Sequence, residues 1–126
     1  MNRIKQTFSN LKKNNEKAVG IFLTAGDPDL ESSFNLIKKL PENGVDFIEI
    51  GMPFSDPMAD GTSIQLSSQR ALKSGTNLTK CLSLVENFRK KNKHTPIILM
   101  GYYNPIYKFG KKKFINKCLE IGVDGL

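Results

Sequence analysis

The sequence has few of the residues and runs that mark metal-binding, disulfide-bonded or membrane-spanning proteins. It contains one histidine and two cysteines, Cys81 and Cys118. Because the two cysteines lack paired spacing, they indicate neither a metal site nor a disulfide framework. Each cysteine falls in an apparent amphipathic helix, so we expect buried, reduced thiols. No apolar run is long enough to span a bilayer, and the N-terminus lacks the apolar core of a signal peptide. These absences favour a cytoplasmic protein.

Acidic residues are outnumbered by basic ones, because the sequence has 12 Asp and Glu but 19 Lys and Arg, which gives a net charge of +7. Such an excess is compatible with a nucleic-acid-binding protein. However, the cations are scattered over Lys12–Lys17, Arg89–Lys93 and Lys108–Lys117, and sixteen of the 19 are lysine. Base and phosphate recognition favours the arginine fork. We therefore interpret the cations as a solvated surface and expect neither nucleic acid nor a membrane as a partner.

Apolar patterning predicts strands that alternate with helices. Short apolar runs predict strands at Val19–Thr24, Val45–Ile50 and Pro96–Gly101, and the opening of a fourth at Val123–Leu126. Helical spacing predicts helices over residues 2–13, 28–40, 63–74, 77–93 and 114–121. This order indicates a parallel sheet with right-handed crossovers. Both an open flavodoxin-like sheet and a closed barrel have such an order, so the pattern alone does not distinguish them.

Three local details complete this pattern. The first helix either covers the N-terminal floor of a barrel or is a frayed surface segment. Asp27 is expected to cap the second helix, with Pro28 at its first position. Tyr103-Asn104-Pro105 is expected to be a loop after the third strand.

The stretch from Val45 to Gly61 is where function is most strongly indicated. Its strand is apolar on both faces, as in a parallel sheet covered on both sides. Glu49 stands near the C-terminal end of that strand, where ligand sites of parallel α/β folds lie. Burying a carboxylate there is costly unless it is paired or protonated, so an ion pair with a nearby lysine is the alternative. Asp60 closes the proline-rich loop that follows.

The run from Glu49 to Gly61 closely resembles the signature of the tryptophan synthase α subunit. Further matching motifs follow one another in the family's order, at residues 22–28, 64–65, 70–71, 100–105 and 122–125. The resemblance implies that residues 1–126 form one partial domain, about the first half of a (β/α)₈ TIM barrel, ending at the fourth strand, with no second domain. The family's phosphate site belongs to the later half of the barrel, so its residues are expected beyond Leu126. Thr62 departs from the proline that the family often has there.

The resemblance also implies an activity. Members of the family are lyases of L-tryptophan biosynthesis that split indole-3-glycerol phosphate into indole and glyceraldehyde 3-phosphate by a retro-aldol cleavage. By resemblance, Glu49 is the general acid/base at the breaking bond and Asp60 binds the indole N–H. Phe22, Met100 and Tyr102 are expected to line the indole pocket; ordinary core packing is the alternative, equally weighted for Met100.

A partner follows from the same resemblance. The family forms an α2β2 heterotetramer in which the β subunit carries pyridoxal phosphate, so this chain is expected to need no cofactor and no metal. The residues expected to face the β subunit are Pro53, Asp56, Pro57, Asn104 and Pro105. The prolines would otherwise only stiffen a surface loop. A second hypothesis is a non-catalytic fragment that only docks on the β subunit or regulates it.

Overall fold

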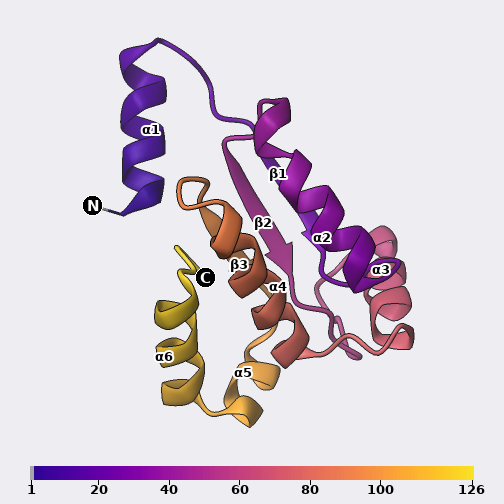
Figure 1. Cartoon of the computed structure of the whole chain (residues 1–126). Coiled ribbons are helices and arrows are strands. Elements are labelled where there is room, and N and C mark those ends of the chain that lie inside the picture. The colour runs from indigo at the N-terminus through magenta and orange to yellow at the C-terminus, as the bar shows by residue number, and fades with distance from the viewer. Residues whose placement is uncertain (1) are drawn as a thin grey trace.

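The structure is a computed structural model that describes residues 2–126, in which strands and helices alternate along the chain (Figure 1). The strands are β1 (Gly20–Thr24), β2 (Phe47–Gly51) and β3 (Ile97–Met100), and they form a parallel sheet in the order β1-β2-β3. The helices are α1 (Arg3–Lys13), α2 (Leu30–Lys39), the 3₁₀ turn η1 (Pro41–Asn43), α3 (Thr62–Lys73), α4 (Leu78–Lys91), α5 (Tyr103–Phe109) and α6 (Lys111–Ile121). The predicted parallel sheet and its three strands are confirmed.

The predicted fourth strand appears as a single parallel bridge between Ile98 and Gly125. The amide of Asp124 donates to the carbonyl of Ile97 at 2.8 Å, and the amide of Leu99 donates to the carbonyl of Gly125 at 3.0 Å. The chain therefore runs beside β3 in the direction that a fourth parallel strand would take.

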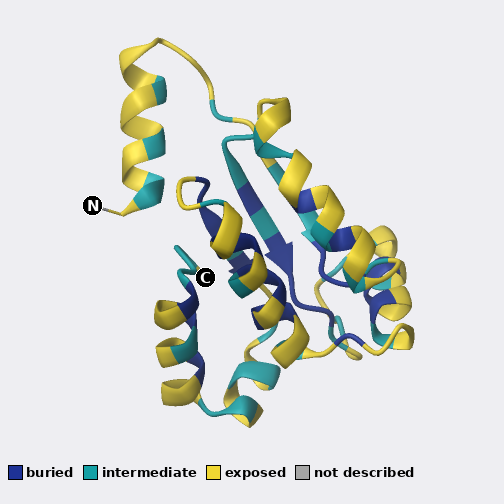
Figure 2. Cartoon of the chain, viewed as in Figure 1, coloured by how far each residue is buried: buried dark blue, intermediate teal, exposed yellow. Residues whose placement is uncertain are grey.

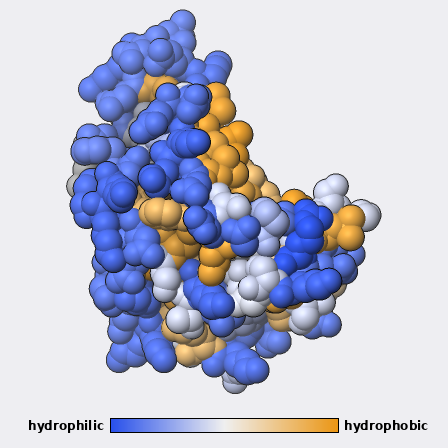
Figure 3. Space-filling view, turned by 45° about the vertical axis from the view of Figure 1, so that its right-hand side comes forward, coloured by the Kyte–Doolittle hydropathy of each residue, from blue (hydrophilic) through white to orange (hydrophobic). Residues whose placement is uncertain are grey.

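The two faces of the sheet have different surroundings. One face carries Ile48, Ile50, Ile97 and Leu99, which are at most 1% exposed, against apolar side chains of α2, α4 and α6 (Figure 2). The opposite face carries residues that are paired across the strands in register, including Phe22, Glu49 and Ile98, and all three are only half-buried. Some apolar side chains are exposed, and in the view of Figure 3 they gather mainly along one side of a mostly hydrophilic surface. The helix-covered face supplies the core, and the opposite face is available for a site.

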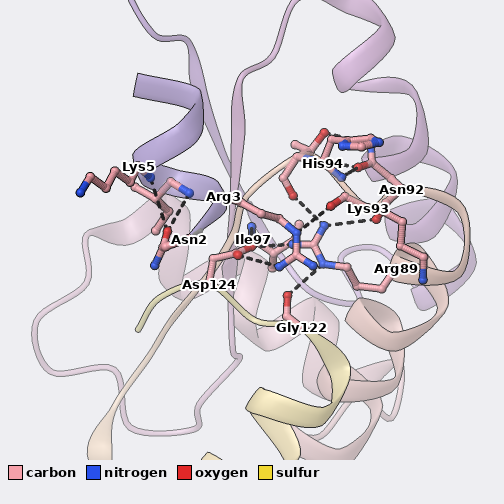
Figure 4. Close-up of polar contacts among 12 residues, drawn as sticks. Asn2, Arg3, Lys5, Arg89, Asn92, Lys93, His94, Ile97, Gly122 and Asp124 are labelled. Atoms are coloured by element: carbon pink, nitrogen blue, oxygen red, sulfur yellow. Dashed lines mark hydrogen bonds and ion pairs between the residues drawn. The ribbon is translucent and has the colours of Figure 1, made fainter. Parts of the chain in front are cut away.

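α1 lies at the N-terminal end of the sheet. Its Phe8 ring packs 6.1 Å from the ring of Phe47, the first residue of β2. Arg3 Nη1 donates to Asp124 Oδ1 at 2.8 Å, and Arg3 Nε donates to the carbonyl of Lys93 at 2.7 Å (Figure 4). These contacts favour the predicted floor helix over a frayed surface segment.

Asp124 is the centre of a buried charge cluster at the N-terminal end of the sheet, beside Ile97 at the start of β3. Its Oδ2 accepts from Arg89 Nη2 at 2.6 Å and from the amide of Ile97 at 2.8 Å, and its Oδ1 accepts from Arg3 (Figure 4). Burial, followed by the nearby Arg3, lowers the pKa of the Arg89 guanidinium to about 10, while Asp124 opposes that shift. The cluster ties α1, α4, β3 and the chain after α6 to one carboxylate.

Two local predictions were wrong. α2 begins at Leu30 and its cap is Asp29, whose Oδ1 accepts from the amide of Ser32 at 2.7 Å; Asp27 instead binds Arg70 through both carboxylate oxygens. The stretch Tyr103–Pro105 is not a loop, because it opens α5. Pro105 is the third residue of that helix, where a proline removes no intrahelical hydrogen bond.

Both cysteine side chains are buried and free, as the sequence predicts. Cys81 is fully buried in α4, and desolvation raises the pKa of its thiol to about 12. Desolvation also raises the pKa of the Cys118 thiol. None of the helices in residues 2–126 combines the length and the apolar character that a membrane span requires.

Candidate active site

The C-terminal ends of the strands carry the side chains that the sequence singles out. Phe22 is opposite Glu49 in the β1–β2 register, and Glu49 is opposite Ile98 in the β2–β3 register. Because in-register residues of parallel strands share a face, and every second residue along a strand shares it too, Met100 lies on the face of Phe22 and Glu49. The sheet thus brings three predicted site residues together on the face opposite α2, α4 and α6.

Two cavities adjoin at this edge. The first, of about 180 Å³, contains Asp60 in its wall, together with Phe22, Met100 and Tyr102. The second, of about 320 Å³, contains Glu49 in its wall. Both cavities are lined by Met52, Met100 and Gly101. The two predicted catalytic carboxylates therefore lie on either side of a shared wall rather than in one cavity.

Glu49 is half-buried between Phe22 and Ile98 on the sheet face. The ion pairs of residues 2–126 involve neither Glu49 nor Asp60. The alternative role predicted for Glu49, a structural ion pair with a lysine, is thus not realised in the described part of the chain. Both carboxylates remain available to a ligand.

The loop that carries Asp60 is held on two sides by side chains of other elements. The hydroxyl of Tyr102 accepts from the amide of Ala59 at 2.8 Å, and Gln65 Nε2 donates to the carbonyl of Asp60 at 2.8 Å. The rings of Tyr102 and Phe54 lie 5.3 Å apart with their planes inclined by 35°. These contacts fix the backbone on both sides of Asp60, and its carboxylate forms no ion pair within residues 2–126.

The back of the first cavity is formed by Ile64 and Ser68 of α3, and α3 is joined to the end of β1. The hydroxyls of Thr24 and Ser67 are hydrogen bonded at 2.7 Å. Arg70 donates to the two carboxylate oxygens of Asp27 at 2.7 and 2.8 Å, and this contact raises the pKa of the Arg70 guanidinium. α3 is therefore a fixed wall.

A glycine is required at position 26 because the loop after β1 closely approaches the loop after α3 there. Its φ is +84°, and a Cβ at this position would lie 1.9 Å from the hydroxyl oxygen of Thr76. The Ser74 hydroxyl also donates to the carbonyl of Gly26 at 3.1 Å. Gly26 and Arg70 lie in motifs that carry the family resemblance, but local sequence predicts no role for them because their partners lie about 43 to 50 positions away in the sequence.

The residues expected to face a partner differ in exposure. Asp56 and Asn104 are exposed, Pro57 and Pro105 are half-buried, and Pro53 is buried. The Asp56 carboxylate accepts from the Ser55 hydroxyl at 2.7 Å, and the neighbouring Met58 is 90% exposed. A partner would therefore meet Asp56 and Asn104, whereas Pro53 acts inside the chain.

The described geometry agrees with comparisons with known proteins. The sequence pattern of the family described as "Tryptophan synthase alpha chain" matches residues 8–126. The chain belongs to the tryptophan synthase alpha chain family. A tryptophan synthase alpha chain from Geotalea uraniireducens is 55% identical over all 126 residues, which cover 100% of this chain and 47% of that protein.

Solved tryptophan synthase alpha chains have the same fold. The crystal structure of tryptophan synthase subunit alpha from Legionella pneumophila matches with a TM-score of 0.97 and 44% identity, over 99% of this chain and 48% of that one. The subunit in the structure of the tryptophan synthase a2b2 complex from Pyrococcus furiosus matches with a TM-score of 0.81 and 47% identity, over 86% of this chain and 45% of that one. The predicted fold, about the first half of a TIM barrel, is confirmed. The chain spans about half the length of the tryptophan synthase alpha chains that it matches.

Proposed function

We propose that this chain supplies the first half of the active site of a tryptophan synthase α subunit, a lyase that cleaves indole-3-glycerol phosphate to indole and glyceraldehyde 3-phosphate. The observation that carries the proposal is the position of two carboxylates, Glu49 and Asp60, on adjoining cavities at the C-terminal end of the sheet. Neither carboxylate forms an ion pair within the described part of the chain. Membership of the family supports the choice of substrate. A cytoplasmic location accompanies this proposal, since the substrate is a water-soluble phosphate ester.

The two carboxylates suit the two charge changes of the reaction. The bond to be broken joins indole C3 to a carbinol carbon, and Glu49, acting first as the general acid, donates a proton to C3 and makes the ring a leaving group. Positive charge then develops at the ring nitrogen, where Asp60 stabilises the N–H. As the C–C bond breaks, the carbinol hydroxyl loses its proton to Glu49 and becomes the aldehyde of glyceraldehyde 3-phosphate.

The walls of the two cavities suit an indole ring. Phe22, Met52, Met100 and Tyr102 offer apolar and aromatic surface around Asp60. Met100 is 43% exposed, so its side chain is accessible to a ligand rather than enclosed in the core. Ring stacking and apolar burial would place the indole N–H toward Asp60, with the glycerol chain toward Glu49.

A β subunit is the proposed partner. The Pyrococcus furiosus relative occurs in an a2b2 complex whose two subunit types activate each other. By the family resemblance, the surface around Asp56 and Asn104 meets this partner, with Pro53, Pro57 and Pro105 shaping the two segments. Pyridoxal phosphate belongs to the β subunit.

A chimeric barrel tests the activity. Residues 1–126 replace the matching part of the Geotalea uraniireducens alpha chain, and release of indole from indole-3-glycerol phosphate is measured with and without a β subunit. We expect the chimera to release indole and the 126-residue chain alone to release none, because the chain contains about half of the matched proteins' length. A chimera that folds, as judged by circular dichroism, but releases no indole would contradict the proposed activity.

A binding assay distinguishes the proposed enzyme from the second hypothesis, a fragment that only docks on the β subunit. An immobilised β subunit is incubated with the 126-residue chain and then with the chimera. Binding of the chimera together with indole release supports the enzyme, whereas binding without indole release supports a docking role.

A further inference from the structure

Tyr102 touches the Asp60 loop at both ends of that loop. Its ring packs against Phe54 at 5.3 Å, and its hydroxyl accepts from the amide of Ala59 at 2.8 Å. Ala59 directly precedes Asp60, and Phe54 follows the buried Pro53. One side chain therefore contacts the start and the end of the loop.

The backbone of Tyr102 belongs to a different part of the molecule. It is the N-cap residue of α5, two positions after Met100, which ends β3. The loop and α5 are 43 residues apart in sequence at the Ala59–Tyr102 contact. The side chain of Tyr102 thus joins the loop after β2 to the helix after β3.

The loop itself has few other restraints. Pro53 and Pro57 lack amide hydrogens, and the internal backbone bonds are Met58 N to Asp56 O at 2.9 Å and Asp60 N to Pro57 O at 3.3 Å. Gln65 holds the carbonyl of Asp60 from the α3 side. Ala59 is exposed, so without the tyrosine hydroxyl its amide would be hydrogen bonded to water.

We propose that Tyr102 is a positioning residue that fixes the Asp60 loop to the start of α5 and couples the position of that helix to the position of Asp60. This role goes beyond the indole-pocket wall expected of Tyr102, and its effect on turnover rests on the proposed function of Asp60. A displacement of α5 moves the hydroxyl that holds the Ala59 amide. A partner bound to Asn104 of α5 and to Asp56 of the loop would therefore act on Asp60 through Tyr102.

Hydrogen exchange tests this coupling without any activity measurement. The chain contains four alanines, Ala18, Ala25, Ala59 and Ala71, so ¹⁵N-alanine labelling resolves each amide separately. The variant Tyr102→Phe keeps the ring on Phe54 but removes the acceptor oxygen. We expect the Ala59 amide to exchange about fivefold faster in this variant, which is the effect of losing one ordinary hydrogen bond.

One internal reference and one matched variant accompany the measurement. The amide of Ala71, buried in α3, should exchange at an unchanged rate, which shows that the fold is intact. Tyr103→Phe, at a neighbouring tyrosine that is 60% exposed, should leave all four amides unchanged. Equal exchange of Ala59 in the unaltered chain and in Tyr102→Phe would overturn the proposal.

The consequence for turnover is measured in the chimera with indole-3-glycerol phosphate. Because Tyr102→Phe preserves the aromatic wall, KM should change less than twofold, whereas kcat should fall about tenfold as Asp60 becomes poorly positioned. A rise in KM with kcat unchanged would make Tyr102 a wall of the pocket and not a positioning residue. An unchanged kcat together with faster Ala59 exchange would confirm the contact but contradict the positioning of Asp60 by Tyr102. Turnover that is insensitive to Asp60→Asn would instead contradict the proposed function, so the two proposals fail separately.

Discussion

Glu49 owes its position to simple alternation along β2. Its neighbours Ile48 and Ile50 are fully buried under helices, so the side chain between them must lie on the opposite face of the sheet. That face is lined by Phe22 and Ile98 in register, and no cation of residues 2–126 forms an ion pair with Glu49 there. The strand therefore presents an acidic group to an apolar surface, as an acid/base residue requires.

At the same scale, burial governs the reactivity of Cys81. Desolvation raises the pKa of this thiol to about 12, so the nucleophilic thiolate is scarce at neutral pH. We expect Cys81 in the native chain to react with a disulfide reagent at pH 8 at least about a hundredfold more slowly than free cysteine. Mass spectrometry after timed labelling checks this rate, with the guanidinium-unfolded chain as the control; rapid native labelling at Cys81 would contradict the buried position.

The same pKa shift has a stability consequence. The pKa of the Cys81 thiol is 9.0 in the unfolded chain and about 12 in the folded chain. Between these two pH values the unfolded state has already lost the proton that the folded state keeps. The contribution of Cys81 to the free energy of unfolding is therefore fully present below pH 9.0 and decreases as the pH rises toward 12. Comparison with Cys81→Ala across this range isolates the contribution from those of other groups.

At the scale of elements, side chains from distant parts of the sequence fix the ends of helices and strands. Local patterns located the strands and most helices correctly, since burial alternates as hydropathy does. They failed at Asp27 and at Tyr103. Asp27 precedes a proline and has the chemistry of a cap, but Arg70 binds its carboxylate, and Asp29 caps α2 instead.

Contacts that join distant segments gave no local signal. Nothing in the sequence around Tyr102 indicates that its hydroxyl binds Ala59, and nothing around Thr24 indicates its bond to Ser67. The position of Glu49, by contrast, depends only on the strand that contains it. Hence the position of Glu49 on its strand could be predicted, whereas the contacts that hold the Asp60 loop could not.

The Asp124 cluster gives the most direct prediction about elements. The side chains of Arg89 and Asp124 are 6% and 4% exposed and form the shortest ion pair of the described chain, at 2.6 Å. Asp124→Asn removes the charge that balances a buried guanidinium, so we expect the free energy of unfolding to fall by about 3 kcal/mol in urea titrations. Glu120→Gln, at a side chain that is 65% exposed, should have little effect. Equal stability of Asp124→Asn and the unaltered chain would show that the cluster does not hold α1, α4 and β3 together.

At the scale of the whole molecule, one face of the sheet is core and the other is site. α2, α4 and α6 cover the first face and leave the C-terminal edge of the second open to two adjoining cavities. The tryptophan synthase alpha chains that this chain matches are about twice its length, and their fold agrees with it along nearly its full length. In the proposed function, these residues supply the acid/base group, the indole N–H partner and part of the pocket.

The surface that is proposed to face the β subunit belongs to this scale too. Asp56 and Asn104 are exposed on two segments of the chain. The segment of Asp56 also contains Asp60, and the segment of Asn104 contacts it through the side chain of Tyr102. A protein bound across both segments would set their relative position. The proposed binding surface and the candidate active site are thus joined by contacts within the described chain.

The most direct test of the account is indole release by the chimeric barrel with Glu49→Gln and, separately, with Asp60→Asn. Both changes keep the size of the side chain and remove its charge, and Glu42→Gln, at an exposed position of η1, is the matched control. We predict that each of the two variants lowers kcat at least about a thousandfold while the chimera still binds indole-3-glycerol phosphate, and that Glu42→Gln leaves kcat unchanged. Turnover by Glu49→Gln or Asp60→Asn near that of the unaltered chimera would contradict the assignment of these carboxylates to catalysis.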